Sequence, residues 1–402
     1  MPGRLRILVL NLRDISSPAA GGAEEHLHQL FRRLAARGHA VTLHCGTYRG
    51  GRGAEVIDGI RVVRRGNRFT TAAWSILFYL MYRRNFDVIV DYTCQLHFLT
   101  PLYVRQPRVA MALHIVSDVY CHDLPLGLGY LLMAWEGVSL RLFYGKEYFS
   151  AICASTAQEL ERFGIRRDRI KVIHGGRREP ALPDGIAKTA YPSLVYHGRL
   201  RQYKRVDWLL RALPEIRTQV PGTRLHLVGS GDQEARLRRL ADQLQLGDAV
   251  VFHGFLPDSA HWRVVGSAWV HLQPSLKEGW SLSVMEAAQL GVPTVATRTA
   301  GLRDVVRDGQ TGELFEPADR ADLVRKTVGL LQDDGRRQAM GTQARRWADS
   351  FSWDRSSVEL EEMLTTQVVR RAALARRPPE PATPAVAAEA ELPVGGTRRT
   401  SL

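Results

Sequence analysis

The apolar residues near the start of the chain change from strand-like to helix-like spacing and back. A continuous apolar run over Leu5–Leu10 is typical of a strand buried in a parallel sheet. After the Gly21-Gly22 pair, apolar residues recur at helical spacing through 23–36, and Ala40–Cys45 again reads as a strand. Strand, glycine loop, helix and strand in this order predict a βαβ unit of a doubly wound α/β domain.

The same alternation continues along the chain and restarts in its second half. Further strands are expected at 60–64, 87–91, 109–114, 151–154, 193–197, 224–228, 249–253, 269–273, 293–296 and 313–316. Helical spacing occupies intervals such as 206–213, 234–244, 281–290 and 336–375. The stretch 180–192 holds Pro, Gly, Asp and Lys without periodicity, so we place a linker there. The expected division is 1–185 for a first domain, 186–350 for a second, 351–375 for a helix returning to the first domain, and 376–402 for a disordered tail.

Composition narrows the class of protein and its partners. With 402 residues, of which 45% are apolar and 24% charged, the chain can form two cores, which excludes a disulfide scaffold and wholesale disorder. The formal net charge of +14 favours an anionic partner such as nucleic acid, anionic lipid or a phosphorylated small molecule. Because no recognition helix or basic-aromatic motif is present, we expect no nucleic acid partner.

Cysteine spacing and hydropathy indicate where the protein works. Cys45, Cys94, Cys121 and Cys153 form no C-x-x-C pair, so we expect neither a zinc site nor disulfides, and a reducing cytosol is the simplest compartment. No signal peptide is recognisable, and no apolar stretch reaches the ~20 residues that a bilayer-spanning helix needs. We therefore expect a cytoplasmic protein without a transmembrane helix.

Two glycine loops follow predicted strands. Gly21-Gly22 could bring backbone amides to an anion at a helix start, or could simply form a tight turn. For Gly229-Ser230-Gly231 the turn is the favoured interpretation, because the third glycine of a dinucleotide fingerprint is missing. The loop after strand 193–197 is more specific. It carries Gly198, Arg199 and Lys204, and the two basic side chains could converge on a diphosphate at the carboxyl edge of the sheet.

The segment 274–287 is the most informative part of the sequence. Glu278 lies in a glycine loop and Glu286 in the following helix, which gives an E-x7-E pair. Gly279 permits a tight turn with exposed amides just before that helix. A sugar needs acceptors for its hydroxyls and a diphosphate needs N–H donors, and this element offers both.

Taken in order along the chain, these segments resemble glycosyltransferase family 4. The resemblance rests on GGAEEHL near the start, followed by HGRL, VGSGD, HGFLP, PSLKEGWSLSVMEAAQLGVPTVAT, GLRDVVRDGQTGELF and FSW. It implies a GT-B fold, in which two Rossmann-like domains face an interdomain cleft that holds a nucleotide-sugar. It also implies a retaining hexosyltransferase that uses no cofactor and no metal, and the sequence indeed holds no D-x-D.

The resemblance assigns roles to individual residues. Arg199 and Lys204 match the pair that grips the donor diphosphate, Glu286 matches the residue that bonds the ribose, and Glu278 matches the one near the donor sugar. His114, at the end of the strand VAMALH, matches a histidine that faces the sugar, with Ser117 and Asp118 as weaker candidates. The catalytic candidates are His114, Arg199, Lys204 and Glu278. The donor-binding candidates are Gly21, Gly22, Gly198, Arg199, Lys204, Glu278, Gly279, Trp280, Ser281, Leu282 and Glu286.

Two departures from the family pattern affect the expected site. His174-Gly175-Gly176 stands where the family usually has P-N-G, and Trp280-Ser281 stands where it usually has F-G. The first change puts the local loop geometry in question, and Ser281 could crowd the donor. A nucleotide-sugar epimerase or hydrolase, and a catalytically weak binding protein, therefore remain alternatives to a transferase.

The resemblance implies a UDP- or GDP-sugar donor and a glycan or lipid-linked acceptor in cell-surface glycoconjugate synthesis. A basic and aromatic segment bears on the acceptor. Arg64, Arg65 and Arg68 precede the apolar run 74–82, and Arg83-Arg84 follow it. This segment could dock on anionic lipid at the inner face of the membrane, or it could be a core helix with solvated ends.

Overall fold

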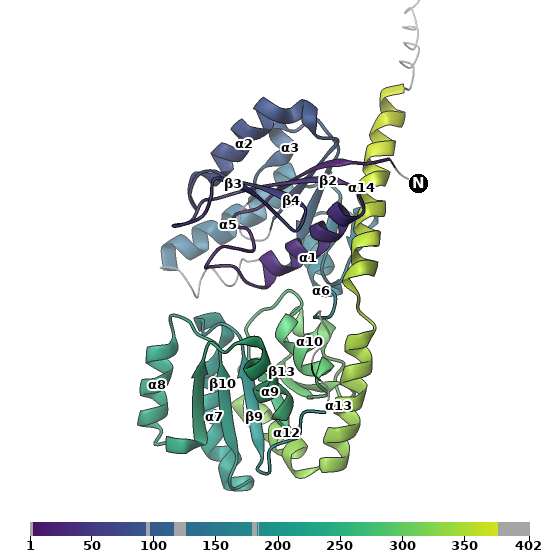
Figure 1. Ribbon diagram of the computed structural model, residues 1–402. Coiled ribbons are helices and arrows are strands. Elements are labelled where there is room, and N and C mark those ends of the chain that lie inside the picture. Colours follow the sequence, from purple (N-terminus) through teal and green to yellow (C-terminus); the bar gives the residue numbers. More distant parts are fainter. Residues whose placement is uncertain (1–2, 94–96, 116–125, 179–182, 184, 377–402) are drawn as a thin grey trace, which may run out of the picture.

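The computed structural model describes residues 3–93, 97–115, 126–178, 183 and 185–376. It contains two α/β domains, each built on a sheet with helices on both of its faces (Figure 1). The candidates Ser117 and Asp118, Cys94, Cys121 and the tail beyond residue 376 lie outside the described residues.

The first sheet has the strand order β3-β4-β2-β1-β5-β6-β7-β8. Every neighbouring pair is parallel except β3 and β4. The strands are β1 (Arg6–Leu10), β2 (Ala40–Cys45), β3 (Ala54–Ile57), β4 (Ile60–Arg64), β5 (Val88–Tyr92), β6 (Arg108–Ala112), β7 (Phe149–Ala151) and β8 (Ile170–Val172). The chain changes direction across the sheet at β1, and ligands of such sheets bind beyond the carboxyl ends of the strands at that point.

The second sheet is wholly parallel and has the order β11-β10-β9-β12-β13-β14. Its strands are β9 (Ser193–His197), β10 (Arg224–Val228), β11 (Val250–Gly254), β12 (Val270–Gln273), β13 (Thr294–Thr297) and β14 (Gly312–Phe315). The corresponding change of direction lies between β9 and β12, the two strands that precede the Arg199 loop and the Glu278 loop.

The helices cover both sheets. Those of the first domain are α1 (Gly22–Ala36), α2 (Thr71–Tyr82), α3 (Thr100–Tyr103), α5 (Leu126–Phe143) and α6 (Ala154–Arg162). Those that follow are α7 (Val206–Gln219), α8 (Glu234–Gln243), α9 (Asp258–Ser267), α10 (Leu282–Gln289), α11 (Leu302–Val305), α12 (Arg320–Gln332), α13 (Asp334–Asp349) and α14 (Trp353–Arg376). Short 3-10 turns are η1 (Arg83–Asn85), η2 (Arg167–Arg169), η3 (Gln202–Lys204) and η4 (Gly247–Ala249).

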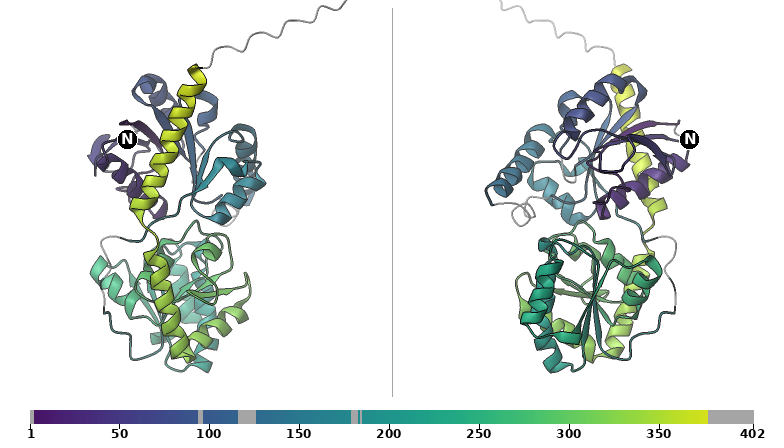
Figure 2. Two further views of the ribbon diagram at one scale, coloured as in Figure 1. Left: turned by 90° about the vertical axis from the view of Figure 1, so that its right-hand side faces the viewer. Right: turned by 60° about the vertical axis from the view of Figure 1, so that its left-hand side comes forward.

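The helical pattern over 336–375 forms two helices rather than one. The break falls between α13 and α14, where Phe351 is largely buried. α13 packs on α10 of the second domain, whereas α14 crosses to the first domain and packs along α1 (Figure 2). The chain therefore passes between the domains twice, once after β8 and once before α14.

The predicted strands of the second sheet agree with the observed ones to within one residue. In the first sheet, β3 and β8 were not predicted, because strands of three or four residues carry too little apolar alternation to detect. The strand expected at 151–154 is wrong in position. β7 ends at Ala151 and α6 already begins at Ala154.

Arg64 does not belong to the exposed basic cluster that the sequence suggested. Its side chain is 0% exposed and forms a two-pronged pair with Asp14, with Nε–Oδ2 at 2.7 Å and Nη2–Oδ1 at 2.8 Å. Glu55 Oε1 lies 2.5 Å from Nη1. The bonds from Arg64 to Asp14 hold the start of the loop between β1 and α1, which ends at Gly21.

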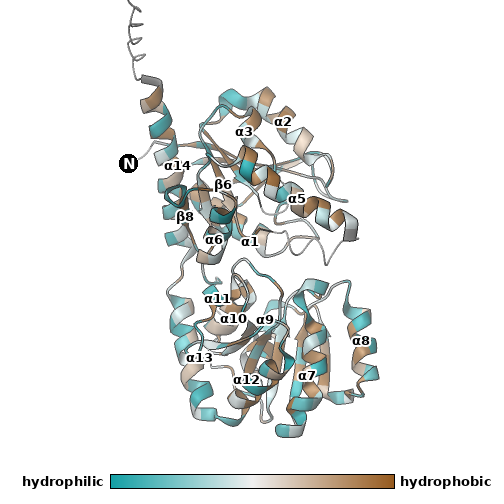
Figure 3. Ribbon diagram, turned by 180° about the vertical axis from the view of Figure 1, so that it is seen from behind, coloured by the Kyte–Doolittle hydropathy of each residue, from teal (hydrophilic) through white to brown (hydrophobic). Residues whose placement is uncertain are grey.

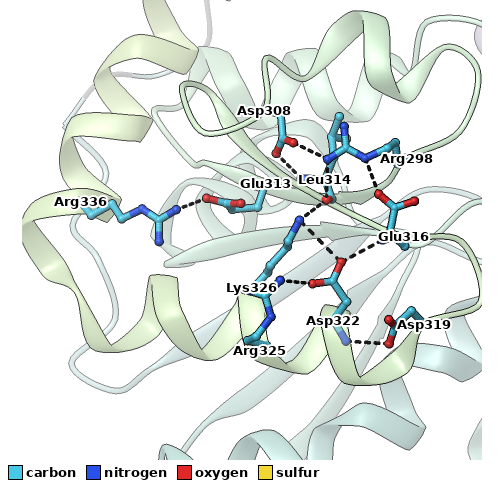
Figure 4. A network of polar contacts seen from close by, with 10 residues as sticks. All are labelled: Arg298, Asp308, Glu313, Leu314, Glu316, Asp319, Asp322, Arg325, Lys326 and Arg336. Carbon is cyan, nitrogen blue, oxygen red and sulfur yellow. Dashed lines mark hydrogen bonds and ion pairs between the residues drawn. The ribbon is translucent and has the colours of Figure 1, made fainter.

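Some of the basic side chains pair with carboxylates in a polar network at the edge strand β14 (Figure 4). Arg298 pairs with Asp308 and Glu316, and Asp308 also accepts a bond from the Leu314 amide. Asp322 accepts a bond from the Glu316 amide and pairs with Lys326. Such charged coverage of a sheet edge discourages pairing with another chain, so we interpret this network as structural.

Two general expectations can be compared with the described residues. Cys45 and Cys153 are buried and unpaired. None of the helices in the described ranges is both long and apolar enough to cross a bilayer.

Candidate active site

Two loops of the second domain bring Lys204 and Glu278 together. The first follows β9 and the second follows β12, so both start at the carboxyl edge of the sheet. Lys204 Nζ lies 2.6 Å from Glu278 Oε1, and the side chains are only 14% and 10% exposed. Gln273 donates a second hydrogen bond to the same oxygen at 2.8 Å.

The pair is ionised. Burial alone would disfavour both charges. The charge and hydrogen bond of Glu278, together with Tyr203 and Tyr196, outweigh it and raise the pKa of Lys204 above its usual value. Burial alone would raise the pKa of Glu278. The charge of Lys204 and hydrogen bonds from Lys204, Ser275 and Gln273 outweigh burial, so the pKa of Glu278 is lowered. The site therefore holds a fixed ammonium and a fixed carboxylate side by side.

Arg199 extends from the second domain toward the glycine loop of the first. It is exposed, and its guanidinium lies so near Gly21 that a Cβ there would be 2.9 Å from Nη2. Gly21 donates its amide to Glu24 at 2.8 Å, and Gly22 opens α1 with its backbone exposed. Within the described part of the chain no carboxylate pairs with the Arg199 guanidinium, so its positive charge is available to an anionic ligand.

Glycine is required in this region by backbone contacts. Gly198 has φ +144°, which residues with a side chain rarely adopt. A Cβ on Gly229 would lie 2.1 Å from the Gly198 carbonyl oxygen, and one on Gly231 would lie 2.2 Å from that of Leu200. Gly229 and Gly231 therefore pack against the Arg199 loop too closely to carry a side chain, which fits the turn interpretation of this segment.

The Glu278 loop also meets the first domain. A Cβ on Gly279 would lie 2.8 Å from the Leu113 carbonyl oxygen, and Leu282 reaches to within 3.7 Å of the Cβ position of Gly22. Gly301 was not singled out from the sequence, yet a Cβ there would lie 2.1 Å from the Glu278 carbonyl oxygen. Its signal in the sequence is that it begins the segment GLRDVVRDGQTGELF, which carries part of the family resemblance.

Ser281 adopts a backbone conformation that suits glycine. Its φ is +59° and its ψ +85°, directly before the first turn of α10. For a serine this conformation costs about 1 kcal/mol, which a glycine would avoid. The departure from the family pattern at this position therefore places strain in the loop rather than a bulky group.

His114 lies two residues beyond the end of β6 and faces the same site. Burial and the nearby charge of Lys277 lower its pKa to about 4, while Glu278 acts in the opposite direction. The ring is therefore neutral at pH 7. The structure brings His114, Lys204 and Glu278 into one electrostatic environment, with Arg199 and the Gly22 amide beside it.

Glu286 lies one turn into α10, and its carboxyl group has a different environment from that of Glu278. Burial raises its pKa to about 7, although Arg178 opposes this with Nη1 3.4 Å from Oε1. His197 Nδ1 lies 3.7 Å from the other oxygen. Arg178 also pairs with Asp258 and was not foreseen, because nothing in the sequence marks one arginine among many.

The two departures from the family pattern contact each other. The His174 ring stacks on Trp280, with ring centres 4.6 Å apart and planes at 30°. Gly175 lies against Trp280, and a Cβ on Gly176 would be 2.3 Å from the Trp353 backbone nitrogen. Trp280 is 2% exposed. Its side chain contacts His174, Gly175 and Phe351, so it joins the segment after β8 and the break before α14 to the Glu278 loop.

Other contacts hold the two domains together beside this site. Lys277 Nζ lies 2.8 Å from Glu159 Oε1 on α6. Arg303 on α11 donates to Ser155 Oγ at 2.8 Å, and Asp304 accepts from the Ser155 amide at 3.1 Å. In the described ranges, no three His, Cys, Asp or Glu side chains gather as ligands of a metal ion.

Comparison with known families covers most of the chain. Residues 20–178 match "Glycosyltransferase Family 4", and residues 182–347 match "Glycosyl transferases group 1". A GDP-mannose-dependent alpha-(1-6)-phosphatidylinositol monomannoside mannosyltransferase of Mycolicibacterium smegmatis is 29% identical over 87% of this chain and 96% of its own length. A glycogen synthase of Mycobacterium tuberculosis is 27% identical over 95% and 98%.

Solved structures show the same architecture. Sucrose-phosphate synthase from Thermosynechococcus elongatus superposes with a TM-score of 0.73 at 20% identity, covering 92% of this chain and 100% of that one. Anabaena HepE in complex with UDP-glucose has a TM-score of 0.70 at 19% identity, with 90% and 100% covered. With its two facing Rossmann-like domains and both family matches, the chain belongs to glycosyltransferase family 4 and has the GT-B fold.

Proposed function

We propose that this glycosyltransferase moves a hexosyl unit from a UDP- or GDP-sugar to a hydroxyl of a glycan or lipid-linked acceptor, with retention and without a metal. The product would serve cell-surface glycoconjugate synthesis. The observation that carries the proposal is the exposed Arg199 guanidinium, which has no carboxylate partner among the described residues. It lies opposite the Gly21-Gly22 loop and near the Lys204–Glu278 pair. Such a group needs an anion, and a donor diphosphate supplies one.

Arg199 and Lys204 would stabilise the leaving group. As the bond between the anomeric carbon and the phosphate oxygen breaks, negative charge develops on the diphosphate. A guanidinium can bond two of its oxygens, and the ammonium acts as a point charge. The exposed start of α1 at Gly22 and the first turn of α10 at Leu282 add amide donors.

Three further side chains would hold the donor. Glu278 is ionised and can accept bonds from sugar hydroxyls. The neutral His114 ring can bond a hydroxyl from the first domain. Glu286 would bond the ribose after exchanging its contact with Arg178.

The chemical step follows from the family's retaining reaction. The acceptor hydroxyl attacks the anomeric carbon on the face from which the diphosphate departs. Its oxygen forms the new glycosidic bond, the bond to the phosphate oxygen breaks, and the hydroxyl proton passes to the leaving phosphate. The contacts at Lys277 and Arg303 would keep the domains closed and water excluded during the step.

The relatives support the substrate classes. The mycobacterial relative is named for GDP-mannose and a phosphatidylinositol monomannoside, and HepE was solved with UDP-glucose. Both nucleotides therefore stay in the proposal, as does a lipid-linked acceptor. A protein acting on such an acceptor would work in the cytoplasm, in peripheral contact with the inner face of the membrane.

The direct test is a screen of the purified chain with UDP- and GDP-sugars, with and without phospholipid-linked and oligosaccharide acceptors. NMR of the product would give its anomeric configuration. We expect acceptor-dependent release of nucleotide and an α-configured product from an α-configured donor. Donor conversion without an acceptor would instead indicate a hydrolase or epimerase, and binding without conversion would indicate a binding protein.

A further inference from the structure

The helices on one face of the first sheet are exposed along apolar side chains. α2, α3 and α5 lie on the face opposite α1 and α14 (Figures 1 and 3). They carry most of the large apolar side chains that are exposed in the described part of the chain. These are Trp74, Leu77, Leu80, Met81 and Tyr82 of α2, Leu102 of α3, and Leu128, Tyr130, Leu131, Trp135, Val138 and Leu142 of α5. We call this surface the α2–α5 face.

The core-helix interpretation of 74–82 is therefore wrong for most of its residues. α2 buries only Thr71, Ser75 and Tyr79. Met81 is 60% exposed, and on α5 Leu131 and Leu142 are 66% and 70% exposed. An apolar surface of this extent on three neighbouring helices marks an interaction site.

In the described ranges, the exposed charged residues on α2, α3 and α5 and at the ends of α2 are all basic. α2 and α3 contain no charged residue, and the one carboxylate of α5, Glu136, is 5% exposed. Arg65, Arg83 and Arg84 are exposed close to the ends of α2, and in the described ranges their guanidinium groups pair with no carboxylate. The surface thus offers apolar and cationic groups but no exposed anion on its helices.

A groove of about 430 Å³ continues this surface behind α2. Its lining includes Trp74, Phe78 and Met81 of α2 together with Arg61 and Arg65 from the β4 region. Arg61 is exposed and likewise has no carboxylate partner in the described ranges. The groove combines a place for an acyl chain with two guanidinium groups for a phosphate.

We propose that the α2–α5 face docks on an anionic phospholipid bilayer and that the groove behind α2 takes one lipid of that bilayer. The charge pattern selects this occupant. Apolar side chains flanked by arginine match a membrane interface, in which the chains enter the acyl boundary and the guanidinium groups meet lipid phosphates. The groove lies apart from the candidate active site, since its lining comes mainly from β2, β4 and α2, with Arg6 of β1 and Ala54 of β3, and includes none of the donor-binding candidates.

The inference deepens the proposed function, because it names the surface from which a lipid-linked acceptor would approach. α5 begins shortly after His114 in the chain and lies on the side of the first domain nearest the second (Figure 1). A bilayer against the α2–α5 face would therefore hold its headgroups beside the candidate active site. Docking itself needs no donor, so it can be tested separately from catalysis.

The test is co-sedimentation of the full chain with vesicles of equal parts phosphatidylglycerol and phosphatidylcholine, compared with phosphatidylcholine alone. We expect binding to the anionic vesicles that weakens with salt. Each arginine should contribute about fivefold, so R83Q/R84Q should lower the partition coefficient about 25-fold. L131S/L142S, which removes two exposed leucines, should lower it at least tenfold.

Matched controls separate docking from folding and from catalysis. R236Q/R239Q removes two exposed arginines from the second domain, and V358S/V369S removes two exposed apolar residues from α14; both should bind as the unaltered chain does. Lys204→Ala should also bind fully, even though it should lose sugar transfer.

R61Q/R65Q tests the groove and should weaken binding to the anionic vesicles about as much as R83Q/R84Q. Two results would overturn the inference: no binding of the unaltered chain to anionic vesicles, or equal loss in the R236Q/R239Q control. Light scattering that shows a dimer dispersed by L131S/L142S, without vesicle binding, would assign the surface to a second copy instead.

Discussion

The stack of His174 on Trp280 should couple the segment after β8 to the Glu278 loop, and a double-mutant cycle can measure that coupling. The changes are His174→Ala, Trp280→Leu and the two combined. Trp280 is 2% exposed and also contacts Phe351 edge to face at 4.9 Å. His174 additionally bonds the Ile152 carbonyl oxygen through Nδ1 at 2.8 Å.

The size of each effect follows from these contacts. Replacing the buried tryptophan should lower the free energy of unfolding by about 3 kcal/mol. His174→Ala should cost about 2 kcal/mol, roughly half from the lost hydrogen bond and half from the lost stack. Because both single variants lose the same stack, the double variant should cost about 1 kcal/mol less than the sum of the two.

Urea unfolding followed by far-ultraviolet circular dichroism gives the three free energies. Nucleotide-sugar titrations should show weaker donor binding in both single variants, since the Glu278 loop loses its support. The matched control pairs His174→Ala with His253→Ala, which stacks on His226 in the second sheet instead. That pair should be additive. A coupling below about 0.3 kcal/mol for His174 and Trp280 would refute the structural link between the two departures.

Three further outcomes are expected. Burial lowers the pKa of His26 and His271 to about 3, so both rings stay neutral in the folded protein. In the unfolded chain these histidines have a pKa near 6.5 and take up protons below it, so each should lower the free energy of unfolding by about 2 kcal/mol between pH 7 and pH 5. A urea midpoint that does not fall on acidification would contradict this. Arg64→Met leaves Asp14 buried without its partner and should cost about 3–5 kcal/mol in the same unfolding assay, against no loss if the pair is dispensable. Ser281→Gly should raise Tm by about 2 °C, because glycine adopts φ +59° without strain; a lower Tm would show that the serine is favourable there.

Much of the fold follows from the sequence because parallel strands buried on both faces read as continuous apolar runs. This holds for β2, β9 and β10, whose bounds agree with the expected ones. β3 and β8 could not be predicted in this way, because they are short strands at the two edges of the first sheet. The break between α13 and α14 was also missed, since apolar spacing alone does not mark where a chain crosses between domains.

The candidate site was predictable where its residues lie in loops that directly follow predicted strands. Arg199, Lys204 and Glu278 are recognisable because they follow predicted strands, and they lie at one interdomain face. Arg178 and Gly301 were not recognisable, because their roles depend on contacts with residues more than twenty positions away. For the same reason the sequence could not show that the side chains of His174 and Trp280 stack on each other.

Calorimetric titration of GDP and UDP into the unaltered chain, Arg199→Ala and Arg201→Ala tests the diphosphate site most directly. Arg201 is the matched control, because it lies two residues away and is already paired with Asp232 at 2.8 Å. We predict that the unaltered chain and Arg201→Ala bind at least one of the two nucleotides equally well. Arg199→Ala should bind it at least tenfold more weakly, as expected for the loss of a charged hydrogen bond. Equal affinity in Arg199→Ala, or no binding of either nucleotide by the unaltered chain, would contradict the site described here.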